Sequence, residues 1–259
     1  MVTEEAGTAP LTDIMNATMD ADARSPAELT HAACFVSPAG GALPYRLYLP
    51  PEAGSGGRRL PLMLCLHGVG SRGTDNQAQM NIGFLSYLRH CQAREAAIIV
   101  APQCPEDRRW VDTDWSAPSH AMPEQPTPFL RMALELVDDL CRRHPVDPNR
   151  RYLSGISMGA FGVWDALQRR PRDFAGAVAI CGGGDAARAA AISHVPVWVF
   201  HGDRDTAVPV CRSRDMVAAL RAHGAPVRYT EYAGMGHNVW ERAFADPALP
   251  AWLFSLRRT

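Results

Sequence analysis

Apolar residues along the chain fall into short runs separated by longer stretches of mixed polarity. Residues 43–49 alternate apolar and polar side chains, as a half-buried antiparallel strand does. Several further runs are almost continuously apolar, which is typical of strands buried on both faces of a parallel sheet. These runs cover residues 62–66, 97–102, 150–157, 174–181 and 195–202. A last strand is expected at residues 227–232.

Helical periodicity occurs between these strands. It is clearest over residues 127–144, where Thr127 is a candidate N-cap, Pro128 occupies the first helical position and apolar side chains recur on one stripe. A second helix is expected at residues 160–169. The alternation of strands and helices predicts an α/β fold, with a mainly parallel central sheet flanked by helices on both faces.

The chain divides into a polar arm and one patterned domain. Residues 1–31 lack clear periodicity and are expected to form a loosely ordered N-terminal arm, whereas residues 32–259 are expected to form a single domain. Residues 103–128 interrupt the alternation as a loop excursion rich in proline and charge. Loops of this length often cover binding sites, so Trp110 and Trp115 are candidate pocket walls unless they anchor the loop to the core.

Composition excludes several classes of protein. All 26 Lys+Arg residues are arginines, which excludes the Walker-A phosphate loop and enzymes that need a lysine amine. A net charge of −1 gives no basic surface for nucleic acid or an anionic membrane. The 7 cysteines form no CxxC pair, so we expect reduced thiols and no structural zinc. The acidic N-terminus does not resemble a signal peptide, and a cytoplasmic location is expected.

The clearest chemical motif is the sequence GISMG at residues 155–159. It has the form G-x-S-x-G and lies between a predicted strand and a predicted helix. In that setting the serine occupies a strained turn with its hydroxyl exposed at a helix N-terminus. Ser157 is therefore a candidate nucleophile, and the amide of Met158 is a candidate oxyanion donor.

A serine nucleophile requires a base and an acid, which would follow it in the order Ser, Asp/Glu, His. Asp203 and Asp205 both follow the strand at 195–202, and His237 lies on a glycine-flanked loop after the last strand. Upstream, the loop after the strand at 62–66 offers the Val69 amide as a second oxyanion donor, with Gly70 as the alternative. Trp240, three residues after His237, is a third candidate pocket wall.

With these residues identified, the chain resembles the α/β-hydrolase superfamily over about residues 40–256. More narrowly, it resembles the predicted esterases and peptidases related to dienelactone hydrolases and to feruloyl or acetylxylan esterases. The motifs that carry the resemblance are LHGVGSRGTDN, APQCPEDRRW, RRYLSGISMGAFGVWDAL, CGGGD, WVFHGDRDTAVPV and GHNVWERAFADPALPAWL. The resemblance implies that the acid is Asp205, since it is the second acid of the HG-x-x-D-x-x-V-P motif.

These residues predict a carboxylic-ester hydrolase that acts through Ser157, Asp205 and His237 on small, aryl or carbohydrate esters. The mechanism requires no metal or organic cofactor. A serine peptidase or amidase could use the same three residues, although ester hydrolysis is the easier reaction. A non-catalytic binding protein with this fold is the other alternative, but such proteins usually lose one member of the triad.

Overall fold

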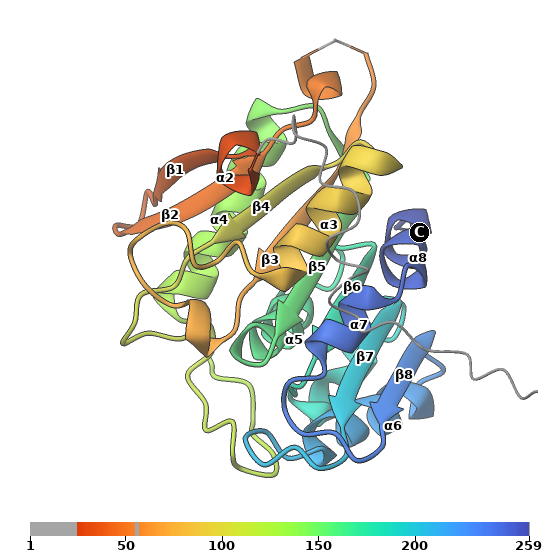
Figure 1. Cartoon of the computed structure of the whole chain (residues 1–259). Coiled ribbons are helices and arrows are strands. Elements are labelled where there is room, and N and C mark those ends of the chain that lie inside the picture. The colour runs from red at the N-terminus through yellow and green to blue at the C-terminus, as the bar shows by residue number, and fades with distance from the viewer. Residues whose placement is uncertain (1–24, 55–56, 259) are drawn as a thin grey trace, which may run out of the picture.

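A single mixed sheet forms the centre of the molecule (Figure 1). The computed structural model describes residues 25–54 and 57–258. Within these residues the sheet has 8 strands in the order β1-β2-β4-β3-β5-β6-β7-β8. They are β1 (His31–Val36), β2 (Ala42–Tyr48), β3 (Leu60–Leu66), β4 (Ile98–Pro102), β5 (Val146–Ile156), β6 (Gly176–Ile180), β7 (Val197–Gly202) and β8 (Val227–Tyr232). β2 is antiparallel to β1 and β4, and the strands from β4 to β8 are parallel.

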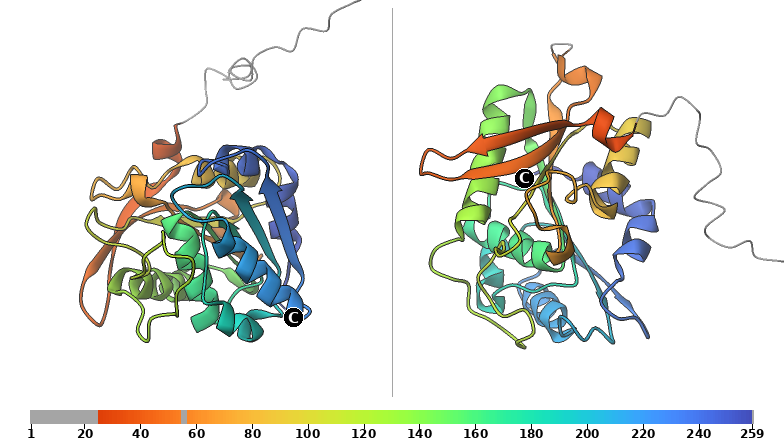
Figure 2. Two further views of the ribbon diagram at one scale, coloured as in Figure 1. Left: turned by 90° about the horizontal axis from the view of Figure 1, so that it is seen from below. Right: turned by 60° about the vertical axis from the view of Figure 1, so that its left-hand side comes forward.

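Helices cover both faces of this sheet (Figure 2). The α-helices are α2 (Pro26–Leu29), α3 (Ile82–Ala93), α4 (Pro128–Arg143), α5 (Met158–Arg169), α6 (Cys211–Ala222), α7 (Trp240–Ala245) and α8 (Ala248–Ser255). Short 3-10 helices are η1 (Pro51–Gly54), η2 (Val69–Ser71) and η3 (Ala186–Ile192). One apolar core lies between the sheet and α4, α5 and α6, and a second lies between the sheet and α3, α7 and α8. The predicted fold class is therefore confirmed.

Local sequence explains the elements that were predicted. Every residue of β3, β4, β6 and β7 is buried, as their continuous apolar runs indicate. α4 starts as expected, because the Thr127 hydroxyl accepts a hydrogen bond from the Leu130 amide at 3.2 Å. β5 starts earlier than predicted because Val146, beyond a polar stretch, pairs with Leu60 of β3.

The N-terminal arm is described only in part, since residues 1–24 lie outside the described residues. Ser25 caps α2 through a capping box with Glu28, and the chain then enters β1. β1 was not predicted, because its identity as a strand depends on pairing with β2. Residues 103–127 contain no helix or strand, as the sequence indicated. None of the helices in the described residues is long and apolar enough to cross a bilayer.

Candidate active site

Ser157 occupies the sharp turn between β5 and α5. Its backbone angles are φ 53° and ψ −118°, a conformation that costs energy for any residue with a side chain. The Ser157 amide donates to the Ile180 carbonyl of β6 at 2.7 Å, and its carbonyl accepts from the Ala160 amide at 2.8 Å. The turn is therefore held from both sides, with the hydroxyl at the carboxyl edge of the sheet.

The two outer glycines of the motif allow the strand and the helix to approach each other. A Cβ atom on Gly155 would lie 2.3 Å from the Gly159 carbonyl oxygen. A Cβ atom on Gly159 would lie 2.0 Å from the carbonyl oxygen of Leu66 in β3. Both contacts are with backbone, which cannot move aside cheaply, so glycine is required at each position by packing.

Hydrogen bonds connect the side chains of Ser157, His237 and Asp205. The Ser157 hydroxyl lies 2.8 Å from Nε2 of His237, and Nδ1 of His237 lies 2.6 Å from Oδ2 of Asp205. Because an ionised carboxylate can only accept a hydrogen bond, Nδ1 of His237 must carry the proton that it donates to Asp205. Nε2 is then unprotonated and can accept the serine proton. The Asp205 side chain is fully buried, whereas that of His237 is 24% exposed, so a ligand can reach the imidazole.

Asp205 is held in its ionised form by its surroundings. Burial disfavours the charge, but hydrogen bonds from His201, His237 and the Val208 amide outweigh burial and lower the pKa of the carboxyl well below its usual range. Oδ1 accepts from the amides of Ala207 and Val208, each at 2.9 Å. The other candidate acid, Asp203, instead accepts the Gly234 amide at 2.7 Å and shapes the loop that leads to His237.

Two residues of this site were missed by sequence reasoning. His201, at the end of β7, lies 3.0 Å from Oδ2 of Asp205 through Nε2 and 2.7 Å from the Ser213 hydroxyl through Nδ1. The Cys181 thiol donates to the His237 carbonyl at 3.2 Å. The H of the HGDRD motif could have suggested His201, but no sequence pattern singles out Cys181.

Cys181, His201 and Asp205 also form a group of the types that can ligate metals, with ligand atoms within 4.8 Å of one another. Each of these atoms already has a hydrogen-bond partner in the site. Burial, followed by the nearby Asp205 carboxylate, raises the pKa of the Cys181 thiol, which therefore stays protonated. The three side chains are better explained as supports for His237 than as a cation site.

A pocket of about 240 Å³ opens beside the Ser157 hydroxyl, lined by η2, Ile82, Ser157, His237 and Trp240, among others. A Cβ atom on Gly68 would lie 3.6 Å from that of Ser157, so the loop ahead of Val69 packs directly against the serine. Met158 begins α5, where amides lack partners within the helix. The Trp240 ring meets that of His237 edge-on, with centroids 5.4 Å apart.

His67 braces the loop that carries Val69. Its Nδ1 donates to the Gly68 carbonyl at 2.7 Å, and its Nε2 accepts from the Cys104 amide at 2.9 Å. Burial lowers the pKa of His67 to about 4, so the ring stays neutral in this arrangement. Both of its partners are backbone groups, so His67 supports the loop rather than acting as a catalytic base.

The structure corrects the prediction for Trp110. Its side chain is completely buried in the core and donates its indole N–H to the His67 carbonyl at 3.0 Å. Trp115 is half-buried, lies under the Arg109 guanidinium at 4.5 Å and packs on the same core. Neither ring lines the pocket beside Ser157, so both anchor the loop, and of the three tryptophans only Trp240 lies at that pocket.

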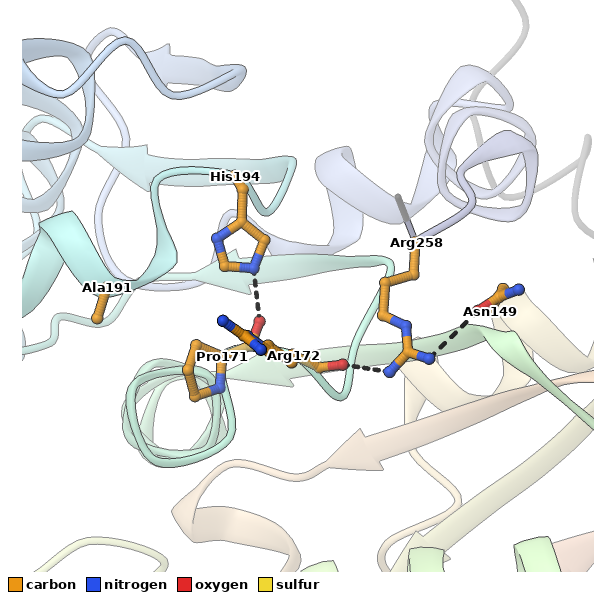
Figure 3. A pocket seen from close by; sticks show the side chains of 6 residues that line it. All are labelled: Asn149, Pro171, Arg172, Ala191, His194 and Arg258. Atoms are coloured by element: carbon orange, nitrogen blue, oxygen red, sulfur yellow. Dashed lines mark hydrogen bonds between the residues drawn. The ribbon is translucent and has the colours of Figure 1, made fainter.

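A larger cavity lies away from Ser157. It measures about 910 Å³ and is lined by residues such as Asn149, Arg172, His194 and Arg258 (Figure 3). His194 donates to the Pro171 carbonyl at 2.8 Å, and Arg258 donates to the Arg172 carbonyl and to Asn149. The Arg258 contacts tie the C-terminal segment to β5 and to the loop at Arg172, and the residues that line the cavity include no nucleophile.

The sheet order and the strand–serine–helix turn define an α/β-hydrolase fold. Residues 38–252 match the family model described as "Putative esterase", and the chain therefore belongs to this esterase family. No match was found among the curated proteins.

Solved structures with this fold include esterases and peptidases. A thermostable esterase is 34% identical with a TM-score of 0.82, and the match covers 89% of this chain and 64% of that one. The chain thus spans 64% of that esterase's length. A ferulic acid esterase is 19% identical with a TM-score of 0.63, and the match covers 87% of this chain and 97% of that one. A puromycin-hydrolyzing peptidase of Mycobacterium tuberculosis is 17% identical with a TM-score of 0.62, and the match covers 86% of this chain and 38% of that one.

Proposed function

We propose that this protein is a carboxylic-ester hydrolase that forms an acyl-enzyme on Ser157 and acts on small, aryl or carbohydrate esters. The observation that carries the proposal is the continuous hydrogen-bonded series from the Ser157 hydroxyl through His237 to Asp205. Membership of the esterase family supports the choice of an ester over an amide.

In the proposed reaction, Nε2 of His237 takes the Ser157 proton while Oγ attacks the ester carbonyl carbon. The oxyanion is bound by the amides of Met158 and Val69. The tetrahedral intermediate collapses, the bond to the alcohol oxygen breaks, and His237 returns the proton to the leaving alcohol. Water, deprotonated by the same imidazole, then releases the acid and restores Ser157.

The test is Ser157→Ala, assayed with 4-nitrophenyl acetate and butyrate and with peptide 4-nitroanilides. We expect ester turnover to fall by at least about 10³-fold with little change in melting temperature, because the hydroxyl acts covalently rather than in packing. Ser255→Ala is the control, since Ser255 is exposed and its hydroxyl donates to the nearby Trp252 carbonyl. A Ser157→Ala variant that keeps a tenth of the activity, or a wild type that prefers the anilides, would contradict the proposal.

A further inference from the structure

A third cavity, of about 310 Å³, lies at the same edge of the sheet as Ser157. Three segments form its wall: residues 118–121 of the long loop, the turn around Gly184 after β6, and the first turn of α6. The Cys211 thiol reaches the Pro118 carbonyl at 3.7 Å, so the long loop meets the start of α6 here (Figure 1). None of the residues assigned to catalysis lines this cavity.

Arg212 is the unusual residue of this cavity. It is 2% exposed, yet it forms no ion pair with any described carboxylate. Its Nη2 donates to Nδ1 of His120 at 2.7 Å, its guanidinium lies 4.9 Å from the centre of the Phe161 ring, and its Nε has no hydrogen-bond partner. A buried cation thus meets a neutral ring nitrogen and an aromatic face where a carboxylate would be expected.

This arrangement is unfavourable for the protein alone. A buried charge without a counter-ion is costly, and Arg212 stands in the first turn of α6, where the helix dipole also disfavours a cation. Burial lowers the pKa of Arg212, and burial followed by the neighbouring Arg212 charge lowers that of His120 to about 4. His120 is therefore a neutral acceptor that an anion could replace with a stronger hydrogen bond.

The charges of Asp114 and Asp215 act on Arg212, but no described carboxylate near it comes close enough to form an ion pair. Asp185 accepts the amides of Met122 and Ala187, Asp114 accepts the amide and hydroxyl of Ser116, and Asp215 is exposed. Together these three negative charges would repel a dianion such as a phosphate monoester more than a monoanion. The ligand that best fits one guanidinium in these surroundings is therefore a single carboxylate, because its two oxygens match the planar donor geometry of the guanidinium.

The cavity is close to the nucleophile. The Phe161 amide donates to the Ser157 carbonyl at 3.2 Å, so the residue whose ring faces Arg212 follows the serine by one helical turn. One turn advances ~5 Å, which places the guanidinium on the order of 10 Å from Ser157. The next residue of α6, Ser213, donates to the Gly182 carbonyl at 2.9 Å and also contacts His201.

We propose that Arg212 binds a free carboxylate on the substrate, so that the enzyme prefers esters carrying a carboxylate a few carbon atoms from the scissile bond. This inference rests on the proposed function. The carboxylate takes the place of the His120 ring beside Nη2 of Arg212. His120 belongs to a segment without helix or strand, so its displacement breaks no regular secondary structure.

The test compares two substrates of the same length: the 4-nitrophenyl half-ester of adipic acid, which keeps a free carboxylate, and its methylated neutral counterpart. Arg212→Met should lower kcat/KM for the half-ester by at least about tenfold, the usual worth of a hydrogen bond to a charged group. For the neutral ester kcat/KM should change less than threefold. Arg214→Met is the matched control, because Arg214 is exposed on the same helix and pairs with Glu231.

Equal losses on both substrates, no loss on either, or the same discrimination in Arg214→Met would overturn the inference. If Arg212→Met does not fold, the substrate preference of the wild type provides the test. A preference for the half-ester of at least tenfold supports a carboxylate site, whereas a smaller preference, or a stronger one for a phosphonate of equal length, overturns it. Failure of the wild type to hydrolyse either ester would instead contradict the proposed function.

Discussion

Asp205 receives hydrogen bonds from two histidines on the same carboxylate oxygen. Oδ2 faces Nδ1 of His237 and Nε2 of His201, while Oδ1 takes two backbone amides. Every lone pair directed at a donor in this way stabilises the anion, which explains why a fully buried carboxyl stays ionised. The anion in turn fixes the proton on Nδ1 of His237.

Replacement of each aspartate by asparagine should separate their roles. Asp205→Asn should lower ester turnover by about 10³–10⁴-fold, because its amide can donate to Nδ1 and so stabilise the wrong tautomer of His237. Asp203→Asn should cost far less, because Asp203 only shapes the loop through the Gly234 amide. The values of kcat for 4-nitrophenyl butyrate decide between them, and a larger loss in Asp203→Asn would show that the acid is wrongly assigned.

The packing of β3, β5 and α5 sets the position of the nucleophile. The start of α5 lies so close to the end of β3 that the Gly159 position meets the Leu66 carbonyl directly. The loop after β3, with Val69, lines the same pocket as Ser157. The position of Ser157 and that of this loop therefore depend on one close contact between α5 and β3.

Gly159→Ala tests this dependence. A Cβ atom 2.0 Å from a backbone oxygen must push α5 away from β3, so we expect the free energy of unfolding to fall by about 3 kcal/mol. Gly70→Ala is the control, since a Cβ atom there meets nothing within 4 Å. Urea unfolding of both variants provides the measurement. Equal stability of Gly159→Ala and Gly70→Ala would mean that this close approach is not required.

At the scale of the whole molecule, the sequence predicts those features that depend on one short segment of the chain. The buried strands appear as apolar runs, α4 appears through its cap, and Ser157, Asp205 and His237 appear through motifs that follow strand ends. Features that depend on contacts between distant segments cannot be predicted from the sequence in this way. The pairing of β1, the buried place of Trp110 and the contact of Arg212 with His120 each depend on residues far apart in the chain.

His67 is one such tertiary feature, and it links stability to pH. It joins the end of β3 to Cys104 and, through its carbonyl, to Trp110 in the long loop. Its pKa in the folded protein is about 4, whereas a histidine in an unfolded chain titrates near 6.5. Between these pH values the unfolded chain binds a proton that the folded protein does not. The contribution of the neutral ring to the free energy of unfolding is therefore complete above about pH 6.5 and is lost as the pH falls toward 4.

Urea unfolding of wild type and His67→Gln at pH 7 and pH 5 measures this linkage. The pKa difference predicts that His67 alone makes the wild type about 2 kcal/mol less stable at pH 5 than at pH 7. Glutamine does not titrate, so the loss between the two pH values should be smaller by about that amount in His67→Gln, even though its stability at pH 7 is lower. His223→Gln, at an exposed histidine, should keep the wild-type loss. If all three proteins lose the same free energy between pH 7 and pH 5, His67 titrates in the folded protein as it does in the unfolded chain, and burial of the neutral ring does not link stability to pH.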